Sequence, residues 1–369
     1  MKKIPAFIKA LLILGILYLF FFVPIPLYLE VPGRAFGLDD MVEVDHEFSS
    51  DPGDFYITTV GVQQTTLFTA LSSVLPFRDL LTEQELFGDM EDFEEYDVIQ
   101  QYYMDSSINT AVQVAFDAAD MDYELHYNGV YVLQVLEESS FAGDLKVGDT
   151  VKSVDGNTFE SSHDFIEYIG NKNVGETVEI EFERGEELLT ASGELIPLDT
   201  GVAGIGIGLV DNTSIETNPE VTIHSGAIGG PSAGLMFSLQ IYNQLTEGNI
   251  HGDYDVAGTG TISPDGTVGR IGGIAKKVVA SDEEGIEYFF APDDELDEEI
   301  LALYPDLQSN YQEALDAAES IDTEMEIIPV KNISDALEFL EGLNQEAAAV
   351  ENEAEFGFVN FQGINPSAA

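Results

Sequence analysis

The sequence predicts an α+β fold preceded by one apolar helix, and three observations support this prediction. Residues 10–29 form a run of 20 residues without a single charge. Short β-branched runs separated by turn residues fill residues 124–200. Apolar residues follow a helical pattern in residues 104–119 and again in 233–245. Because the strand-rich part forms one block and does not alternate with helices, the pattern is typical of α+β domains.

The composition excludes several classes of protein. The chain has 69 Asp and Glu against 13 Lys and Arg, a formal net charge of −56, whereas binding nucleic acid requires a basic surface. The absence of Cys excludes disulfides, thiolate zinc sites and a cysteine nucleophile. The five His lack the spacing of metal ligands, so we expect neither a metal nor a cofactor.

The first element is expected to be a membrane anchor. Residues 1–9 carry three lysines and precede the apolar run 10–29, which is long enough to cross a bilayer of about 30 Å. Lysines on this side predict a cytoplasmic N-terminus, a single pass through the cell membrane in contact with its lipid, and an extracytoplasmic remainder. The run ends in bulky residues with Pro24 and Pro26 and has no small-residue cleavage site. An uncleaved signal anchor is therefore favoured over a cleaved signal peptide.

Three segments carry structural signals between the apolar run and the strand-rich block. Gly53–Val62 has the pattern of a β-strand. Asp79–Asp97 contains nine acids and no base, which indicates a solvated loop or an exposed helix. Met104–Ala119 has apolar residues at helical spacing and is expected to form an amphipathic helix.

The strand-rich block resembles a bacterial PDZ domain. The resemblance rests on Gly129-Val-Tyr-Val, on Ala142-Gly-Asp-Leu-Lys-Val-Gly-Asp149 and on Ser153-Val-Asp-Gly156, followed by a helix and a final strand. Such a domain takes a peptide as an added strand, with a loop before that strand holding a terminal carboxylate. The resemblance implies that the loop consists of Tyr127, Asn128, Gly129 and Val130. The alternative is a small β-rich insertion without a ligand.

Ser232 is the strongest candidate nucleophile in the chain. It follows Gly229-Gly-Pro231 and precedes an apolar helix, where free backbone N–H groups can hold an oxyanion. The alternative is that Ser232 only caps this helix. A Ser-His-Asp enzyme would need a late histidine, but only His251 follows, and no strand leads into the glycine turn.

A lysine is the better candidate for the base. The motifs Gly230-Pro-Ser-Ala-Gly, Thr259-Gly-Thr-Ile-Ser and Gly266-x-Val-x-x-Ile-Gly-Gly-Ile-x-x-Lys277 resemble the proteolytic domain of the Lon family. The match implies Ser232 as nucleophile and Lys277 as general base. It also implies supporting roles for Thr259, which would hydrogen-bond the amine, and for Gly230, Pro231 and Ala233 around the serine.

The resemblance extends to nearly the whole chain and implies a domain order. Residues Asp54–Leu71, Met104–Ala119, Ile286–Pro292 and Ile328–Leu340 match the family's other strands and helices. The expected order is a cytoplasmic N-terminus (1–9), an anchor (10–29), a first protease part (30–123), a PDZ domain (124–200), a catalytic part (201–345) and an acidic, disordered tail (346–369). This order is similar to the membrane-anchored PDZ-Lon proteases, the YlbL-like group of Gram-positive bacteria.

The resemblance implies a membrane-anchored serine endopeptidase with a Ser-Lys dyad. Its substrates would be membrane or envelope proteins selected by the PDZ domain, a cell-division inhibitor among them, and Lon-type domains generally form rings, which implies a homo-oligomer. The chain has no Gly-Lys dipeptide and hence no Walker A loop, so we expect proteolysis without ATP. Gly229 stands where ATP-dependent relatives usually have an acid. The alternative is a catalytically silent PDZ scaffold or binding protein at the membrane.

A lysine base must lose its proton near neutral pH. Because the pKa of free lysine is about 10.4, the site must lower it by roughly three units. We expect an apolar wall that includes Ile274 and Val278 to bury Lys277, and we expect its neighbour Lys276 to be solvated.

Overall fold

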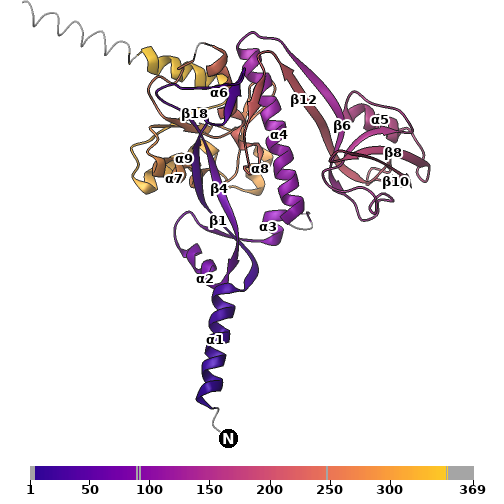
Figure 1. The fold of residues 1–369 in the computed structure, drawn as a ribbon, viewed down its shortest axis with the longest axis horizontal. Helices are drawn as coiled ribbons and strands as arrows, with labels where there is room; N and C mark the ends of the chain where they lie inside the picture. Colours follow the sequence, from indigo (N-terminus) through magenta and orange to yellow (C-terminus); the bar gives the residue numbers. More distant parts are fainter. Residues whose placement is uncertain (1–4, 89, 91–92, 247, 346, 348–369) are drawn as a thin grey trace, which may run out of the picture.

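The computed structural model describes residues 5–345 and residue 347, apart from 89, 91–92 and 247. These residues form two folded bodies, and helix α1 (Ala6–Phe22) projects from the larger one (Figure 1). The smaller body lies at the end of a long two-stranded ribbon. The expected tail, 346–369, lies outside the described residues except for residue 347.

A six-stranded mixed sheet is the centre of the larger body. Its order is β18 (Glu326–Val330), β17 (Tyr288–Pro292), β14 (Val256–Gly258), β4 (Phe55–Thr66), β1 (Pro24–Gly37) and β5 (Asp79–Thr82). The strands from β18 to β4 are parallel, and β1 and β5 add to this sheet in antiparallel pairs. The expected strand at 53–62 therefore exists as β4, and β1 is a strand that the apolar run concealed.

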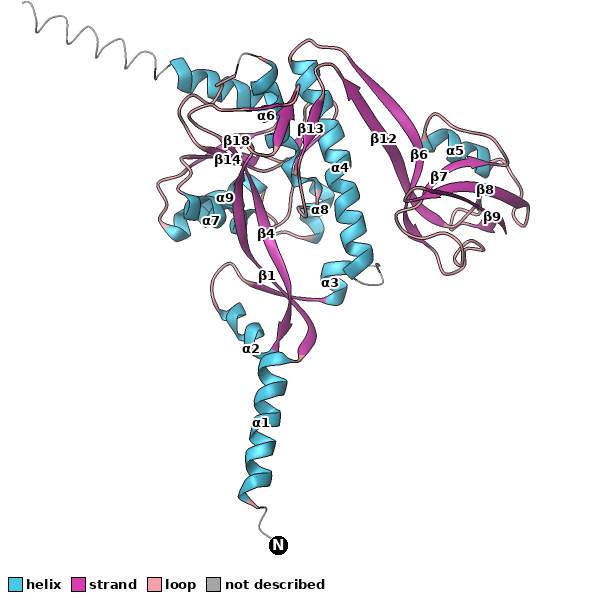
Figure 2. Cartoon of the chain, viewed as in Figure 1, coloured by secondary structure: helices cyan, strands magenta, loops and turns pink. Residues whose placement is uncertain are grey.

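Helices cover both faces of this sheet (Figure 2). On one face α4 (Phe93–Ala118) and α6 (Gly234–Leu245) pack on each other, and α6 packs on β4, around a core that includes Phe55 and Phe237. On the other face α7 (Ile274–Glu284) packs against α9 (Asn310–Ile321) and β1. The larger body is therefore a three-layer sandwich that buries two separate cores.

Shorter elements complete the larger body. They are α2 (Leu67–Ala70), η1 (Leu71–Val74), α3 (Glu83–Phe87), α8 (Glu298–Leu303), a helix over 333–345, the sheet of β13 (Val221–Ile223), β2 (Val42–Val44) and β3 (Glu47–Phe48), and the pair β15 (Thr261–Ile262) and β16 (Val268–Gly269). The acidic segment 79–97, expected to be a loop or a helix, contributes β5, α3 and the start of α4.

The smaller body is an antiparallel sheet with one helix. The strand order is β12 (Ile207–Thr217), β6 (Tyr123–Val135), β7 (Thr150–Val154), β8 (Thr177–Arg184) and β9 (Glu187–Glu194), with α5 (Ser162–Gly170) and the pair β10 (Ile196–Pro197) and β11 (Ala203–Gly204) beside it. Its own buried cluster includes Phe141, Phe165 and Ile180. Strand β12 belongs to this sheet, although the expected boundary at residue 200 placed it in the next domain.

The edge strand of the smaller body also contacts α4. Tyr102 stacks on Tyr131 of β6 with ring centroids 4.1 Å apart, and its hydroxyl donates to the carbonyl of Asp211 at 2.6 Å. About two turns further along the same face of α4, the Asn109 amide donates to the carbonyl of Thr213 at 2.8 Å. The two carbonyls belong to β12, so α4 links the two bodies.

The N-terminal prediction is corrected by the structure. The helix covers residues 6–22 and not 10–29, because Pro24 and Pro26 lack the N–H that a helix needs and disfavour helical geometry at the residues before them. The chain continues directly as β1, which enters the sheet. Among the residues that the structure describes, no helix has both the length and the apolar character required to cross a membrane.

Candidate active site

Ser232 lies at the start of a helix, directly after a sharp glycine turn. Gly230 has a φ of 90°, in the region that favours glycine, and Pro231 begins the 3-10 helix η2 (Pro231–Ala233), which leads into α6. The first N–H groups of a helix have no partner within it, so they can face an anionic group next to Ser232.

Two elements hold this turn in position. From α4, the carbonyl of Gln100 accepts the Gly230 N–H at 2.8 Å, and the Ser107 hydroxyl donates to the carbonyl of the residue before Ser232 at 3.0 Å. From the segment after β14, the Gly260 N–H donates to the Ser232 carbonyl at 2.8 Å. The turn is therefore fixed from both sides.

The amine of Lys277 contacts the hydroxyl of Ser232. The Nζ atom lies 2.7 Å from Ser232 Oγ and 3.0 Å from Thr259 Oγ1. Thr259 in turn donates its hydroxyl hydrogen to the main-chain carbonyl of Ser232 at 3.0 Å, so Oγ1 can accept a hydrogen from the amine. With one N–H directed at Thr259, the lone pair of a neutral amine can face the serine hydroxyl.

Burial changes the protonation of Lys277. Its side chain comes from the first turn of α7, and only 3% of the residue is exposed. Desolvation lowers the pKa of Lys277 to about 7, and the negative charge of Glu30 opposes this shift. Ile274 and Val278, expected as its apolar wall, are completely buried in the cluster beneath α7. The amine can therefore be neutral at physiological pH.

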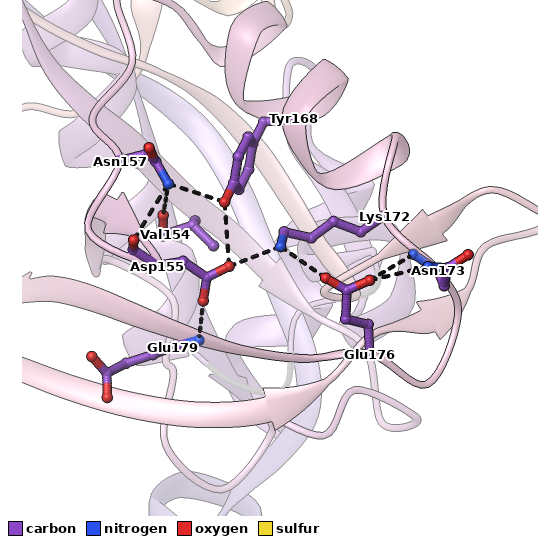
Figure 3. Close-up of polar contacts among 8 residues, drawn as sticks. All are labelled: Val154, Asp155, Asn157, Tyr168, Lys172, Asn173, Glu176 and Glu179. Atoms are coloured by element: carbon purple, nitrogen blue, oxygen red, sulfur yellow. Dashed lines mark hydrogen bonds and ion pairs between the residues drawn. The ribbon is translucent and has the colours of Figure 1, made fainter.

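A partly exposed lysine of the smaller body has the opposite surroundings. Figure 3 shows Lys172 between Asp155 and Glu176, each 2.9 Å from its Nζ. The hydrogen bonds to these two carboxylates raise the pKa of Lys172. Lys277 takes part in none of the salt bridges found between described residues. The lack of a carboxylate partner is what a lysine needs in order to act as a base near pH 7.

Lys276 is not the solvated neighbour that the sequence suggested. Only 6% of the residue is exposed, and its Nζ lies 2.7 Å from Glu30 on β1 and 2.5 Å from Asp79 on β5. Although desolvation acts against its charge, hydrogen bonds to these two acids raise the pKa of Lys276. The prediction failed because the acids are distant in sequence and meet Lys276 only through the pairing of β1 with β5.

A pocket of about 430 Å³ opens in front of Ser232. The walls are β4, the first half of α4 and the glycine turn, and they include the expected supporting residues Gly230, Pro231 and Ala233. Gly229, which stands in place of an acid, also lines the pocket. Lys277 also lines the pocket.

One edge of β4 is open toward this pocket. Strand β14 pairs only with Phe55–Ile57 of β4, and the chain turns away after Gly258 toward Thr259. From Thr58 to Val62, β4 has no further strand partner on that side among the described residues, and these residues line the pocket. An extended peptide could add to this edge next to Ser232.

The expected peptide-binding loop of the smaller body is part of a strand. Tyr127, Asn128, Gly129 and Val130 lie within β6, which has β12 on one side and β7 on the other. These residues therefore do not form a loop before an edge strand. The outer strands of the sheet are β12 and β9, and the sequence assignment placed β12 in the catalytic part.

The structure also shows residues that sequence reasoning missed. Gln100 and Ser107 support the serine turn, and Glu30 and Asp79 hold Lys276. Ser107 had a signal, since it is a polar residue on the apolar side of an expected helix. Nothing in the sequence distinguishes Glu30 and Asp79 from the many other acids of the chain. His251 lies elsewhere, packed edge-on against Phe55, and its Nδ1 lies 3.1 Å from the Gly252 carbonyl.

Two domain families match the chain. Residues 119–195 match the PDZ domain, and residues 207–341 match the Lon protease (S16) C-terminal proteolytic domain. The PDZ and Lon-type domains predicted from the sequence are confirmed by these matches, which support a serine peptidase. Among the described residues, no group of acids and histidines could hold a metal ion.

Curated relatives match between about a third and two fifths of this chain. A Lon protease of Aster yellows witches'-broom phytoplasma (strain AYWB) is 28% identical over 131 residues, which are 35% of this chain and 14% of the relative. The Caenorhabditis elegans "Lon protease homolog 2, peroxisomal" is 30% identical over 154 residues, which are 41% of this chain and 17% of the relative. The chain thus spans about one sixth or less of the length of these relatives.

Solved structures match the smaller body. The PDZ domain of an SdrC-like protein from Listeria monocytogenes is 42% identical, with a TM-score of 0.22, and the match covers 23% of this chain and 90% of that one. The second domain of a Listeria protein is 47% identical, with a TM-score of 0.22, and the match covers 23% of this chain and 87% of that one.

Proposed function

We propose that this chain, which combines a PDZ domain with a Lon-type proteolytic domain, is an ATP-independent serine endopeptidase with Ser232 as nucleophile and Lys277 as general base. The observation that carries the proposal is the 2.7 Å contact between Ser232 Oγ and the buried amine of Lys277. A serine hydroxyl is a weak nucleophile and needs an adjacent base of this kind.

The geometry supports a two-step hydrolysis. The neutral amine of Lys277 takes the hydroxyl proton as Ser232 Oγ bonds to the peptide carbonyl carbon, and the N–H groups at the start of η2 and α6 face the oxyanion. The lysine then gives its proton to the leaving amine, which departs and leaves an ester on Ser232. Water adds to the ester carbonyl while Lys277 accepts its proton. The lysine then returns that proton to Ser232 Oγ as the carbon–oxygen bond of the ester breaks and the carboxylic acid departs.

The dyad is tested with single substitutions in the full chain. We expect Ser232→Ala and Lys277→Ala to abolish cleavage of an unfolded, fluorescently labelled casein without ATP, with unchanged circular dichroism. A fluorophosphonate probe should label the wild type and not Ser232→Ala. Full activity of Lys277→Ala would refute the dyad, and unlabelled wild-type protein would favour a silent scaffold.

We propose that substrates bind as an added strand on the open edge of β4, at Thr58–Val62. The open backbone edge and its position beside Ser232 support this arrangement. Because the sequence contains no Walker A loop for ATP-driven unfolding, suitable substrates are chains that are already extended. Envelope and membrane proteins, with a cell-division inhibitor as one example, fit this requirement, and ring assembly as in other Lon-type domains is part of the proposal.

For the PDZ domain, we propose that peptide ends bind between β12 and α5. Strand β12 is the outer strand on the side of α5, and the Ser162 N–H of α5 donates to the side chain of Asp211 on β12 at 2.7 Å. One turn further along α5, Ile166 is 53% exposed and offers an apolar contact beside that edge. Ile166→Asp should weaken binding of peptides with a free carboxylate, measured by fluorescence anisotropy. Val174→Asp, which changes an exposed apolar residue elsewhere in the domain, should not.

We also propose that α1 attaches the chain to the cell membrane, with the catalytic domain on the extracytoplasmic side. Most of its large apolar side chains are exposed, including Phe7 and Leu14, and none is buried. Phe68 of α2 packs against the end of α1, and Leu71 and Val74 of η1 add further exposed apolar surface. Desolvating this surface favours insertion into lipid.

Vesicle flotation tests this attachment. The full chain should float with phosphatidylcholine–phosphatidylglycerol vesicles, and the variant Leu14→Glu should bind less. Leu188→Glu, an equally exposed apolar site in the PDZ domain, is the matched control and should float like the wild type. Equal flotation of Leu14→Glu would contradict the proposal.

A further inference from the structure

Lys276 is adjacent to the candidate base on α7 and contacts two strands of the six-stranded sheet, β1 and β5. Lys276 and Lys277 are consecutive residues in the first turn of α7, and both are almost completely buried. Their side chains diverge, so that Lys277 reaches Ser232 and Lys276 reaches the carboxylates of Glu30 and Asp79. Two adjacent buried lysines therefore have opposite surroundings, one with carboxylates and one without.

Glu30 is close enough to influence both lysines. Its carboxylate is 2.7 Å from Lys276, and its side chain is 21% exposed, which limits screening by water. The negative charge of the same carboxylate favours the charged form of Lys277 and opposes the lowering of its pKa by burial. Without a partner, this carboxylate would hold a proton on the base.

Lys276 counteracts this effect in two ways. Its ammonium neutralises Glu30 at hydrogen-bond distance, and as a positive charge next to Lys277 it disfavours a second positive charge. The position of both lysines at the start of α7 adds to the effect, since the positive end of a helix dipole disfavours cations. The ion pairs also tie α7 to β1 and β5, which fixes the helix that carries Lys277.

Other titratable groups surround α7. On neighbouring elements they are Glu30 (β1), Tyr56 (β4), Asp79 (β5), Tyr96 and Asp97 (α4), and Glu313 (α9). Glu313 is paired with Arg270, and Asp79 is paired with Lys276. Burial raises the pKa of both tyrosines, so they carry no charge near neutral pH. Among these groups, Glu30 is the acid that opposes the lowered pKa of Lys277, and Lys276 is the cation that pairs with it.

Resting on the proposed Ser-Lys mechanism, we propose that Lys276 is a positioning residue that cancels the field of Glu30 and keeps the amine of Lys277 free of its proton at neutral pH. Removing Lys276 alone leaves Glu30 facing the base, whereas removing Glu30 alone leaves Lys276 paired with the more exposed carboxylate of Asp79. The two substitutions therefore shift the acidic limb of the pH–activity profile in opposite directions. The double substitution should return this limb close to its position in the wild type.

The test is a double-mutant cycle read by pH dependence. For Lys276→Gln we expect the acidic limb of kcat/KM to move up by about one pH unit, which is about a tenfold loss at pH 7 that recovers at higher pH. Glu30→Gln should move the limb down, and Glu30→Gln/Lys276→Gln should lie near the wild type. Lys276→Arg, which keeps the charge, should also stay near the wild type. Lys331→Gln removes an ion-paired but half-exposed lysine and controls for net charge.

A second readout separates this proposal from the proposed function. The NMR titration of Lys277, labelled at Cε and assigned with Lys277→Arg, reports its proton directly, even in a protein that cleaves nothing. The proposal is overturned if Lys276→Gln lowers kcat/KM equally at every pH, or if the Lys277 titration stays unchanged. If Lys276→Gln fails to fold, the test rests on Glu30→Gln. An acidic limb of kcat/KM that does not move to lower pH in this variant refutes the proposal. Shifted titrations without peptidase activity would refute only the proposed function.

Discussion

At the scale of single residues, the burial that prepares Lys277 for catalysis also costs stability. The pKa of this lysine is about 7 in the folded chain, against about 10.4 in the unfolded chain. Between these values the unfolded state binds more protons than the folded state, so the contribution of Lys277 to stability falls as the pH drops from 10 to 7 and is constant below that. The group that performs the chemistry therefore opposes folding at neutral pH.

Replacing Lys277 with Met should remove this cost. We expect Lys277→Met to be more stable than the wild type at pH 7, by a few kcal/mol at about 1.4 kcal/mol per pKa unit, and this advantage should shrink toward pH 10. Urea unfolding at several pH values measures the difference. Lys146→Met replaces an exposed lysine, so its free energy of unfolding should depend on pH in the same way as that of the wild type. A constant difference between Lys277→Met and wild type would count against a depressed pKa.

Thr259 should matter through its hydroxyl alone. Thr259→Val keeps the shape of the side chain but removes the acceptor for Lys277 and the donor to the Ser232 carbonyl. The loss of hydrogen bonds worth about 1–3 kcal/mol predicts a kcat/KM that is lower by about 5- to 150-fold. Thr259→Ser retains the hydroxyl and should retain most activity. Wild-type rates in Thr259→Val would show that the contact is only structural.

The site residues were predictable to different degrees. Ser232, Thr259 and Lys277 lie in three short glycine-rich motifs, and the resemblance of these motifs to the Lon proteolytic domain grouped them. Lys276 was misjudged because its partners, Glu30 and Asp79, are about 200 residues or more away in sequence. Only strand pairing brings them together, and no local pattern records it.

At the scale of elements, the segment that leads into α7 is held by a buried amide. Asn310, which is 0% exposed, accepts the Ile271 N–H at 2.7 Å and donates to the Ile271 carbonyl at 3.1 Å. Arg270 reinforces the same segment through Asp294 and Glu313. Because α7 begins three residues later, this anchor determines where Lys277 lies.

Asn310→Ala should therefore impair both stability and activity. It leaves a buried N–H and a buried carbonyl without partners, at a cost of about 2–5 kcal/mol. Thermal unfolding and the rate of peptide cleavage measure the two effects. Gln308→Ala removes an exposed amide but keeps the main-chain carbonyl that Arg270 contacts, so it should change little. Similar melting temperatures for both variants would contradict the role assigned to Asn310.

The elements show where sequence patterns failed. Residues 24–29 are as apolar as the helix before them, so β1 was hidden, and only Pro24 and Pro26 marked its start. The helix expected from Met104 begins at Phe93, because the acids Glu94 and Glu95 suit a helix start as well as a loop. Strand β12, which the sequence places with the catalytic part, pairs along its whole length with β6, and no local pattern indicates this pairing.

At the scale of the whole molecule, net charge should control stability. A chain with 69 acids and 13 basic residues repels itself in the compact state, and salt shortens the Debye length from about 30 Å at 0.01 M to about 3 Å at 1 M. We therefore expect the melting temperature to rise with NaCl. Sucrose at equal osmolality controls for effects other than screening, and a melting temperature that is insensitive to NaCl would contradict this account.

The ribbon of β6 and β12 has a consequence for the history of the chain. Tyr123 and Thr217 pair at its base, so the chain leaves the larger body and returns to it at adjacent points. A precursor needed only a short hairpin between α4 and β13, and lengthening that hairpin would have accommodated a complete module without disturbing the three-layer core. The same junction allows the module to be exchanged for another in a single genetic event, so recognition and hydrolysis can evolve separately.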